Sequence, residues 1–208
     1  MHKYTNTENN KEKIGIIVAV FIFLIINIIN LGLKKFDVPY HIEEGWVSKF
    51  LFVSSTIYYL TYEQWFCKKL WKTIIFQKIL STPNLNGIWD MKGESVNTLK
   101  GVFLFEGEIK IIQEFNKISI CLITKNSDSS SISAQLTKNS DGNYKLDYTY
   151  SNNPKDNSEM NRDMRKHDGH CTIIFSPDLK TAECKYFNDG RERTSYGTMK
   201  LTRKEEVI

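Results

Sequence analysis

The sequence has little proline and glycine, and its few cysteines are widely spaced. Four Pro and eleven Gly among 208 residues exclude a collagen-like or proline-rich linker protein. Cys67, Cys121, Cys171 and Cys184 form no C-x-x-C pair and show no metal-ligand spacing, so neither a disulfide scaffold nor a zinc site is expected. The pattern is typical of buried thiols in a reducing compartment.

Motifs of catalysis are also missing. The chain has no Walker loop, no G-x-S-x-G, no H-E-x-x-H and no Rossmann fingerprint. His167 and His170 form an H-x-x-H, but residues three apart in an extended segment point to opposite faces, so shared metal ligation is not expected. We therefore predict a protein that is not an enzyme, with no catalytic residue, no metal site and no bound cofactor.

Excess positive charge is missing from the C-terminal part of the chain. The whole chain has a formal net charge of +4, and residues 1–80 account for all of it, with ten lysines against six acidic residues. Residues 81–208 hold eighteen basic and eighteen acidic groups. A protein that binds a nucleic-acid duplex needs a basic patch on its folded domain, so no DNA or RNA duplex partner is expected.

A run of twenty residues without a charge, Ile14 to Leu33, is the strongest single signal in the sequence. At about 1.5 Å per residue it spans the roughly 30 Å hydrocarbon core of a bilayer, and it lacks a signal-peptide cleavage site. Residues 46–62 carry aromatic residues at both ends and predict a second transmembrane helix, although their short length leaves an interfacial helix open. Residues 67–80 predict a linker helix. Residues 1–80 are thus predicted to be an α-helical transmembrane hairpin with its linker, and the flanking lysines favour cytoplasmic termini.

From residue 81 onward the pattern of apolar residues changes from helical to alternating. Short turns such as Asp141-Gly142-Asn143 separate most of the alternating segments. Eight strands are predicted, at residues 87–95, 101–113, 117–124, 130–138, 143–150, 169–175, 182–187 and 194–203. Strands joined consecutively by short turns form a meander, and eight can close. Residues 81–208 are therefore predicted to be a cytoplasmic ligand-sensing domain, an eight-stranded up-and-down antiparallel β-barrel.

The alternation also predicts the inward-facing side chains of the barrel. These are Trp89, Met91, Phe103, Phe105, Ile118, Ile120, Leu122, Ile132, Ala134, Leu136, Tyr144, Leu146, Tyr148, Tyr150, Cys171, Ile173 and Phe175. A β-bulge would reverse the parity of any strand that contains one. Arg203, at the end of the last strand, is expected to stack over Trp89 and close one end of the barrel.

All five arginines lie in the last quarter of the chain, although lysine occurs throughout. The guanidinium group suits bidentate phosphate recognition and stacking on bases better than the lysine ammonium does. The polar segment 151–168 is a candidate lid at one rim of the barrel. Surface ion pairs with Asp163 or Glu192 are the alternative role for each of these arginines. The predicted ligand-binding residues, for a small anionic nucleotide, are Arg162, Arg165, Arg191, Arg193, Tyr148, Tyr150 and Tyr196.

Two membrane helices, the junction Thr82-Pro83-Asn84-Leu85-Asn86-Gly87-Ile88-Trp89 and an eight-stranded meander together resemble the two-transmembrane β-barrel effectors of CBASS antiphage systems, the CD-NTase-associated membrane effectors. The resemblance implies a multi-pass protein of the bacterial inner membrane, with both termini and the barrel in the cytoplasm. It also implies a 3′,3′-cyclic dinucleotide ligand, made by a partner CD-NTase after phage infection. Ligand binding would then drive assembly of a homo-oligomer and disruption of the lipid bilayer, which kills the infected cell by abortive infection.

The opening Gly87-x-Trp89, with Arg203 on the last strand, is similar to the lipocalin-like barrel pattern. This similarity supports an up-and-down barrel and implies a second function, a membrane-tethered carrier of a small apolar ligand. Lipocalins are usually exported, whereas the cysteines and lysines here favour a cytoplasmic domain, so the carrier ranks second. A membrane-anchored interaction barrel without a ligand is the third possibility.

Overall fold

The structure, a computed structural model, describes residues 1–7, 14–16, 18–20, 23–25, 27–28, 32, 53–97, 101–155, 166–190 and 193–204. The chain divides into two compact units. Residues Met1–Asn9 and Leu80–Ile208 form the first, and residues Asn10–Ile79 form the second. The predicted division into a membrane region at 1–80 and a sensing domain at 81–208 stays a prediction, but the first nine residues group with the barrel.

The second unit is helical wherever it is described, apart from short turns. Residues 53–58 are helical and continue into η1 (Tyr59–Phe66), a π-helix. A 3-10 turn, η2 (Leu70–Lys72), precedes α3 (Ile74–Leu80), and extended Thr73 separates the two, so the predicted linker helix is interrupted. In η1 the Tyr62 ring stacks on Tyr58 and Phe66, with centroids 5.4 and 5.9 Å away.

The predicted membrane spans fall largely on residues that the structure does not describe. Within residues 14–33 the described positions are helical, and the remainder lie outside the described residues. Of the second predicted span, residues 46–52 also lie outside. Among the described residues, no helix combines the length and the apolar character needed to cross a bilayer. Both spans therefore stay predictions.

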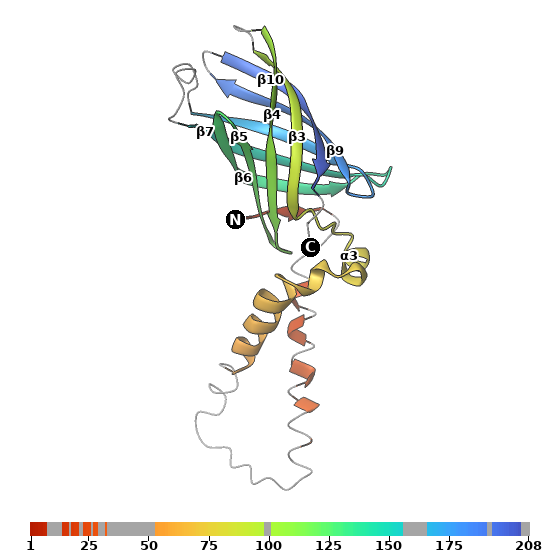
Figure 1. Cartoon of the computed structure of the whole chain (residues 1–208). Coiled ribbons are helices and arrows are strands. Elements are labelled where there is room, and N and C mark those ends of the chain that lie inside the picture. The colour runs from red at the N-terminus through yellow and green to blue at the C-terminus, as the bar shows by residue number, and fades with distance from the viewer. Residues whose placement is uncertain are drawn as a thin grey trace. The chain divides into compact units, whose positions relative to one another are not determined.

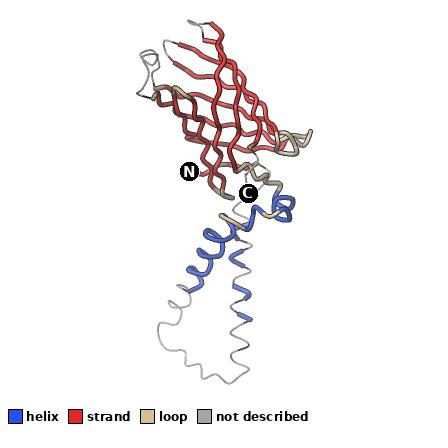
Figure 2. The backbone as a smooth tube through the Cα atoms, viewed as in Figure 1, coloured by secondary structure: helices blue, strands red, loops and turns tan. Residues whose placement is uncertain are grey.

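Eight long strands of the first unit form a closed antiparallel up-and-down barrel, so the predicted fold of this domain is confirmed (Figure 1 and Figure 2). Each strand pairs with its neighbour in the sequence, and the last strand pairs with the first along residues 195–203 and 89–97. The strands are β3 (Gly87–Asn97), β4 (Gly101–Gln113), β5 (Lys117–Thr124), β6 (Ser127–Lys138), β7 (Tyr144–Pro154), β8 (His167–Phe175), β9 (Thr181–Gly190) and β10 (Arg193–Arg203). All eight predicted strands are present, and several extend a few residues further than predicted.

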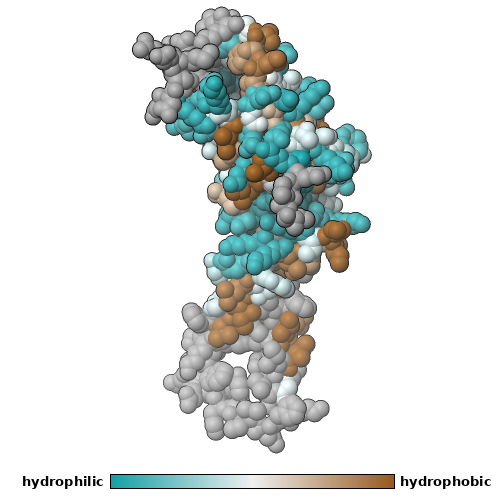
Figure 3. Space-filling view, viewed as in Figure 1, coloured by the Kyte–Doolittle hydropathy of each residue, from teal (hydrophilic) through white to brown (hydrophobic). Residues whose placement is uncertain are grey.

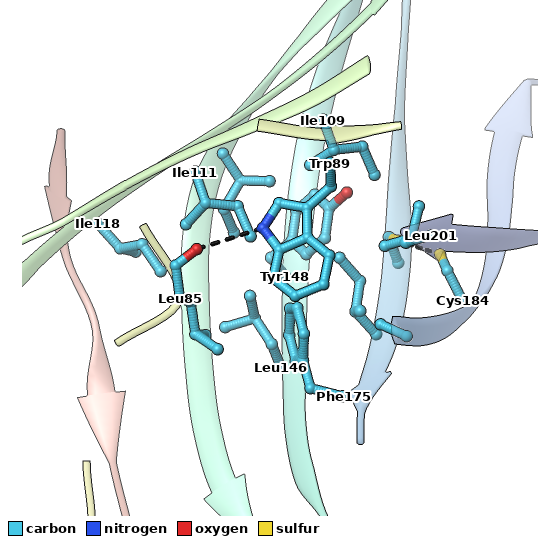
Figure 4. Packing of buried hydrophobic residues seen from close by; sticks show 14 of the residues in the cluster. Leu85, Trp89, Ile109, Ile111, Ile118, Leu146, Tyr148, Phe175, Cys184 and Leu201 are labelled. Atoms are coloured by element: carbon cyan, nitrogen blue, oxygen red, sulfur yellow. Dashed lines mark hydrogen bonds between the residues drawn. The ribbon is translucent and has the colours of Figure 1, made fainter. Parts of the chain in front are cut away.

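The core of the barrel is centred on Trp89, whose side chain is fully buried (Figure 4). The indole Nε1 donates a hydrogen bond to the carbonyl of Leu85 at 3.3 Å, and the ring meets Phe175 edge-on with centroids 5.0 Å apart. The Arg203 guanidinium lies 5.3 Å from the Trp89 ring and donates to the carbonyls of Asn84 and Asn86. The predicted stacking of Arg203 over Trp89 is confirmed.

Among the predicted inward positions, Ile132 is wrong, and Phe103 faces inward but stays partly exposed. Ile132 is 54 % exposed because a register shift between Ser131 and Ser133 reverses the alternation of β6. Before this bulge the inward positions are Ser127 and Ser129, and both are buried. Phe103 has the predicted parity but lies at the end of its strand, where 43 % of its surface remains exposed.

The N-terminal residues form two short strands that the sequence did not indicate. Strand β1 (His2–Lys3) pairs with β5, and β2 (Thr5–Asn6) pairs with β6 in parallel. They extend the sheet to ten strands. Figure 1 shows this segment in red at the N-terminus.

Candidate functional site

The two ends of the barrel differ in the side chains that point inward. At one end, here called the base, Trp89, Arg203 and Phe175 close the interior. At the other end, here called the mouth, strands β3, β5, β7 and β9 end and strands β4, β6, β8 and β10 begin. The inward positions near the mouth carry aromatic rings, hydroxyls and amides. The mouth therefore offers both stacking surfaces and hydrogen-bonding groups.

Four aromatic side chains line the interior below the mouth. The rings of Phe105 and Tyr186 meet edge-on with centroids 6.0 Å apart, and those of Tyr148 and Tyr150 are 6.2 Å apart and inclined by 53°. Tyr148 and Tyr150 are buried, and the other two are half-buried against the core. Aromatic faces of this kind can stack against a planar base.

Three glycines make room for these rings. Gly93 lies directly opposite Phe105, Gly169 opposite Tyr150 and Gly197 opposite Tyr186 in the strand register. A Cβ added to Gly169 would stand 2.4 Å from the Tyr150 hydroxyl, and one added to Gly197 would stand 2.9 Å from the Tyr186 ring. Both distances are below contact range, so each tyrosine folds over the backbone of its partner strand. The glycines therefore fix where the rings lie.

A layer of small polar side chains lies next to the rings, nearer the opening. The Asn97 amide donates to the Ser195 hydroxyl at 2.8 Å, and the Asn188 side-chain oxygen accepts from the Ser195 backbone amide at 2.7 Å. Further buried polar residues at this end are Ser95, Ser127, Ser129 and Asn152. Hydroxyl and amide groups can both donate and accept, so this layer suits the mixed donors and acceptors of a base edge.

The tyrosines of the interior are neutral hydrogen-bonding groups at physiological pH. Burial raises the pKa of Tyr148 and Tyr150 above the usual value of 10.0, and the nearby Cys171 raises both further. Burial also raises the pKa of Tyr186, against an opposing effect of its hydrogen bond with Ser95. A phenol that keeps its proton adds no negative charge to the site, so these residues do not repel a phosphate.

Of the three tyrosines predicted to bind ligand, the structure brings two together and separates the third. Tyr148 and Tyr150 point inward from β7. Tyr196 lies on the opposite face of the sheet, since its neighbours Gly197 and Met199 hold the inward parity, and it is 51 % exposed. The sequence placed Tyr196 near a rim but not on a face, because that choice depends on strand parity.

The predicted arginines belong to segments that begin and end at the mouth. Arg162, Arg165 and Arg191 lie outside the described residues. Arg193 begins β10 and pairs with Gly190. The strands on either side of segments 156–165 and 191–192 end and begin at the mouth, and the role of these arginines in ligand binding stays a prediction.

Phe105 and Tyr186 complete the aromatic set, but neither was among the predicted ligand-binding residues. Phe105 was predicted to face inward and does. Tyr186 was not singled out, although it continues the alternation of the buried Ala182 and Cys184 along β9. That alternation was the available signal, together with the glycines that stand opposite the rings.

The outer face of the barrel near the mouth carries an exposed apolar strip, the outer band, which consists of Val102, Leu104, Phe187 and Tyr196. Leu104 is 82 % exposed, and the others are half or more exposed. Tyr196 stands directly beside Phe187 in the strand register, and Val96 bridges Tyr196 to Val102. Figure 3 shows hydrophobic side chains at the surface over the ends of β3 and β4. Contiguous apolar surface of this kind marks an interaction site more often than scattered residues do.

Comparison with known proteins identifies the family. Residues 80–203 match the family model described as "Cap15, cyclic dinucleotide receptor domain". The chain is also 35 % identical over 205 residues to CD-NTase-associated protein 15 of Yersinia aleksiciae. That alignment covers 95 % of this chain and 94 % of the Yersinia protein. The match spans the barrel and extends into the N-terminal segment. The chain therefore belongs to the Cap15 family of CBASS-associated proteins, and its barrel is a cyclic dinucleotide receptor domain.

Proposed function

We propose that this protein is the membrane effector of a CBASS antiphage system and acts by binding rather than by catalysis. The barrel takes a 3′,3′-cyclic dinucleotide, made by a partner CD-NTase, into its mouth. Binding promotes self-association, and residues 10–79 then disrupt the bacterial inner membrane and kill the cell by abortive infection. The observation that carries this proposal is the mouth itself, where aromatic rings and neutral polar groups adjoin the ends of the arginine-containing segments.

The bases and the phosphates of a cyclic dinucleotide need different groups of the protein. The bases stack on the rings of Phe105, Tyr150 and Tyr186 and exchange hydrogen bonds with the polar layer. The phosphates need cations. Lys155 is a described lysine at this end, and its ammonium is paired with Asp128 at 2.8 Å and donates to the Thr124 carbonyl. The arginines of segments 156–165 and 191–193 supply the bidentate phosphate contacts.

The membrane part of the proposal depends on the uncharged run at 14–33 and the aromatic-flanked stretch at 46–62. Lysines on both sides favour cytoplasmic termini, with the barrel on the same side as the CD-NTase product. A helical hairpin that enters the inner membrane twice gives a multi-pass protein. Self-association of many copies would concentrate these hairpins and perturb the bilayer.

For self-association the outer band is the surface we assign, with a second copy of this chain as its occupant. Residues 81–208 have no formal net charge, so two barrels do not repel each other. A surface that binds anionic lipid or nucleic acid would instead be expected to carry excess positive charge. The charged residues beside the band are of both signs, for example Lys92 and Glu106, whose side chains pair at 3.7 Å, and this mixture is compatible with a self-complementary contact.

The proposal is tested by isothermal titration of the full chain in lipid nanodiscs with a panel of cyclic dinucleotides and fatty acids at two salt concentrations. Phosphate recognition predicts tight binding of a cyclic dinucleotide that weakens as ionic strength rises. Exchange of Arg191 and Arg193 for Ala together is expected to weaken binding by about tenfold or more. Binding of fatty acids alone would favour the apolar carrier instead, and no binding at all would favour the ligand-free interaction barrel.

Assembly is tested separately with Leu104→Glu, which places a charge in the outer band. Because Leu104 is exposed and points outward, away from the interior of the barrel, this variant is expected to keep its ligand affinity and to lose ligand-induced oligomers and toxicity. Lys92→Glu, on the same outer face but outside the band, is the matched control. Ligand-induced oligomers that survive Leu104→Glu would refute the assigned surface without affecting the binding site.

A further inference from the structure

The barrel has one incomplete seam, between β5 and β6. These neighbouring strands pair directly at only three positions, Cys121–Ile123 with Asp128–Ser130, all near the mouth. Toward the base the bulge at Ser131 and Ser133 turns β6 away. The lower halves of the two strands would then expose unpaired backbone groups, which fold best when another strand covers them.

Residues 2–6 occupy this seam. His2 and Lys3 pair with Ile118 and Lys117 of β5, while Thr5 and Asn6 pair in parallel with Gln135 and Leu136 of β6. The chain continues with a hydrogen bond from the Thr7 amide to the Leu136 carbonyl at 3.1 Å.

The bulge itself takes part in the contact. The hydroxyl of Ser131 accepts a hydrogen bond from the Ile120 amide at 3.0 Å, and it lies 2.7 Å from Nε2 of His2. One residue of β6 thus links β5 to the N-terminal segment where direct pairing between β5 and β6 stops.

The alternate side chains of the segment are buried, as they are in a true strand. Tyr4 is 5 % exposed and belongs to the core cluster of the barrel, whereas Lys3 and Thr5 are exposed. The Tyr4 hydroxyl accepts a hydrogen bond from the side-chain amide of Gln113 at 3.1 Å. Gln113 is fully buried, and its oxygen accepts from the Leu85 amide at 2.8 Å. Loss of either partner would leave a buried polar group of Gln113 without a hydrogen bond, which is unfavourable.

A second contact ties the segment to the start of the barrel. The Asn6 side-chain amide donates to the Thr82 hydroxyl at 2.9 Å, and Thr82 donates to the Leu80 carbonyl at 3.1 Å. All of these side chains lie in the first compact unit. These bonds hold Asn6 against the residues that lead into the first long strand of the barrel.

We propose that the β5–β6 seam is a strand-binding site whose ligand is residues 2–6 of this chain. The segment completes the barrel by β-augmentation: backbone pairing supplies affinity, and the buried Tyr4 and Asn6 supply specificity. It also ties the N-terminal segment to Thr82, just before the first long strand of the barrel. Residues 2–6 lie outside the matched range 80–203, and the inference does not depend on the identity of the cyclic dinucleotide.

The test is hydrogen exchange, followed by mass spectrometry, on the full chain and on a chain lacking residues 2–7, both in nanodiscs without ligand. Loss of the segment is expected to speed exchange about tenfold or more in residues 117–120 and 134–138, and to leave residues 171–175 nearly unchanged. A synthetic peptide of residues 1–7 added to the shortened chain should restore protection. The same peptide with Tyr4→Ala should not, whereas Thr5→Ala, at an exposed position of the same strand, should.

Unchanged exchange in the seam after removal of residues 2–7 would overturn the inference, as would equal rescue by the Tyr4→Ala and Thr5→Ala peptides. Should the shortened chain fail to fold, Asn6→Ala and Thr5→Ala in the full chain provide the same comparison. Asn6→Ala removes the hydrogen bond to Thr82 and is expected to speed exchange of residues 134–138 about threefold or more, with no effect from Thr5→Ala. Equal exchange in these two variants would also overturn it.

Discussion

Replacement of Arg203 by lysine should loosen the base of the barrel although the positive charge is kept. The planar guanidinium lies over Trp89 and donates to two backbone carbonyls, those of Asn84 and Asn86. A lysine ammonium reaches one carbonyl at a time and stacks less well. Loss of one charge-assisted hydrogen bond costs about 1.5 to 3 kcal/mol, and loss of the cation–π contact costs about 0.5 to 2 kcal/mol.

The expected net loss is about 2 to 4 kcal/mol, because lysine keeps part of the contact. At about 1.4 kcal/mol per factor of ten, slowly exchanging amides of β3 and β10 should then exchange roughly 30 to 700 times faster in the full chain. Lys200→Ala, at an exposed position on the same strand, is the control and should change exchange by less than about threefold. An Arg203→Lys protein that also stays within threefold of the wild type would refute the role assigned to the guanidinium.

Three further predictions concern residues in or below the mouth of the barrel. Gly169→Ala places a Cβ 2.4 Å from the Tyr150 hydroxyl and 2.7 Å from the Phe187 carbonyl, so the ring must move, and titration calorimetry should show cyclic dinucleotide affinity about tenfold lower. Tyr186→Phe removes one hydroxyl and should weaken binding by about fivefold; the outward Tyr196→Phe is its control, and equal losses would contradict the assignment of faces. Because the pKa of Tyr148 is raised above 10.0, the unfolded chain loses this proton first as pH rises. The urea midpoint, followed by circular dichroism, should therefore be insensitive to this group below about pH 9 and fall above pH 10, less steeply in Tyr148→Phe; equal slopes would contradict the prediction.

The sequence predicted the barrel well because alternation and turn residues are local signals. Eight alternating segments separated by short turns gave eight strands, and the pairing of Trp89 with Arg203 followed from the first and last strands. The parity of β6 failed at Ile132, since one extra residue at a bulge reverses every side chain after it.

The site was predicted less completely than the fold. Tyr148 and Tyr150 were correctly predicted to face inward because both sit in a strongly alternating strand. Tyr196 was grouped with them by residue type and position along the chain, but it faces outward. The pairing of Phe105, Tyr150 and Tyr186 with glycines on adjacent strands depends on register between strands, which no single segment encodes.

The sequence by itself determined the architecture of the receptor, since a period of two and regular turns admit few other folds. It also indicated that Tyr148 and Tyr150 face the interior, because both continue the alternation of one strand. Only the tertiary structure decided which face each ring takes and what closes the seam between β5 and β6. The segment of residues 2–6 is too short for its sequence alone to predict a strand. It takes up strand pairing because β5 and β6 supply backbone partners and the core supplies a buried site for Tyr4.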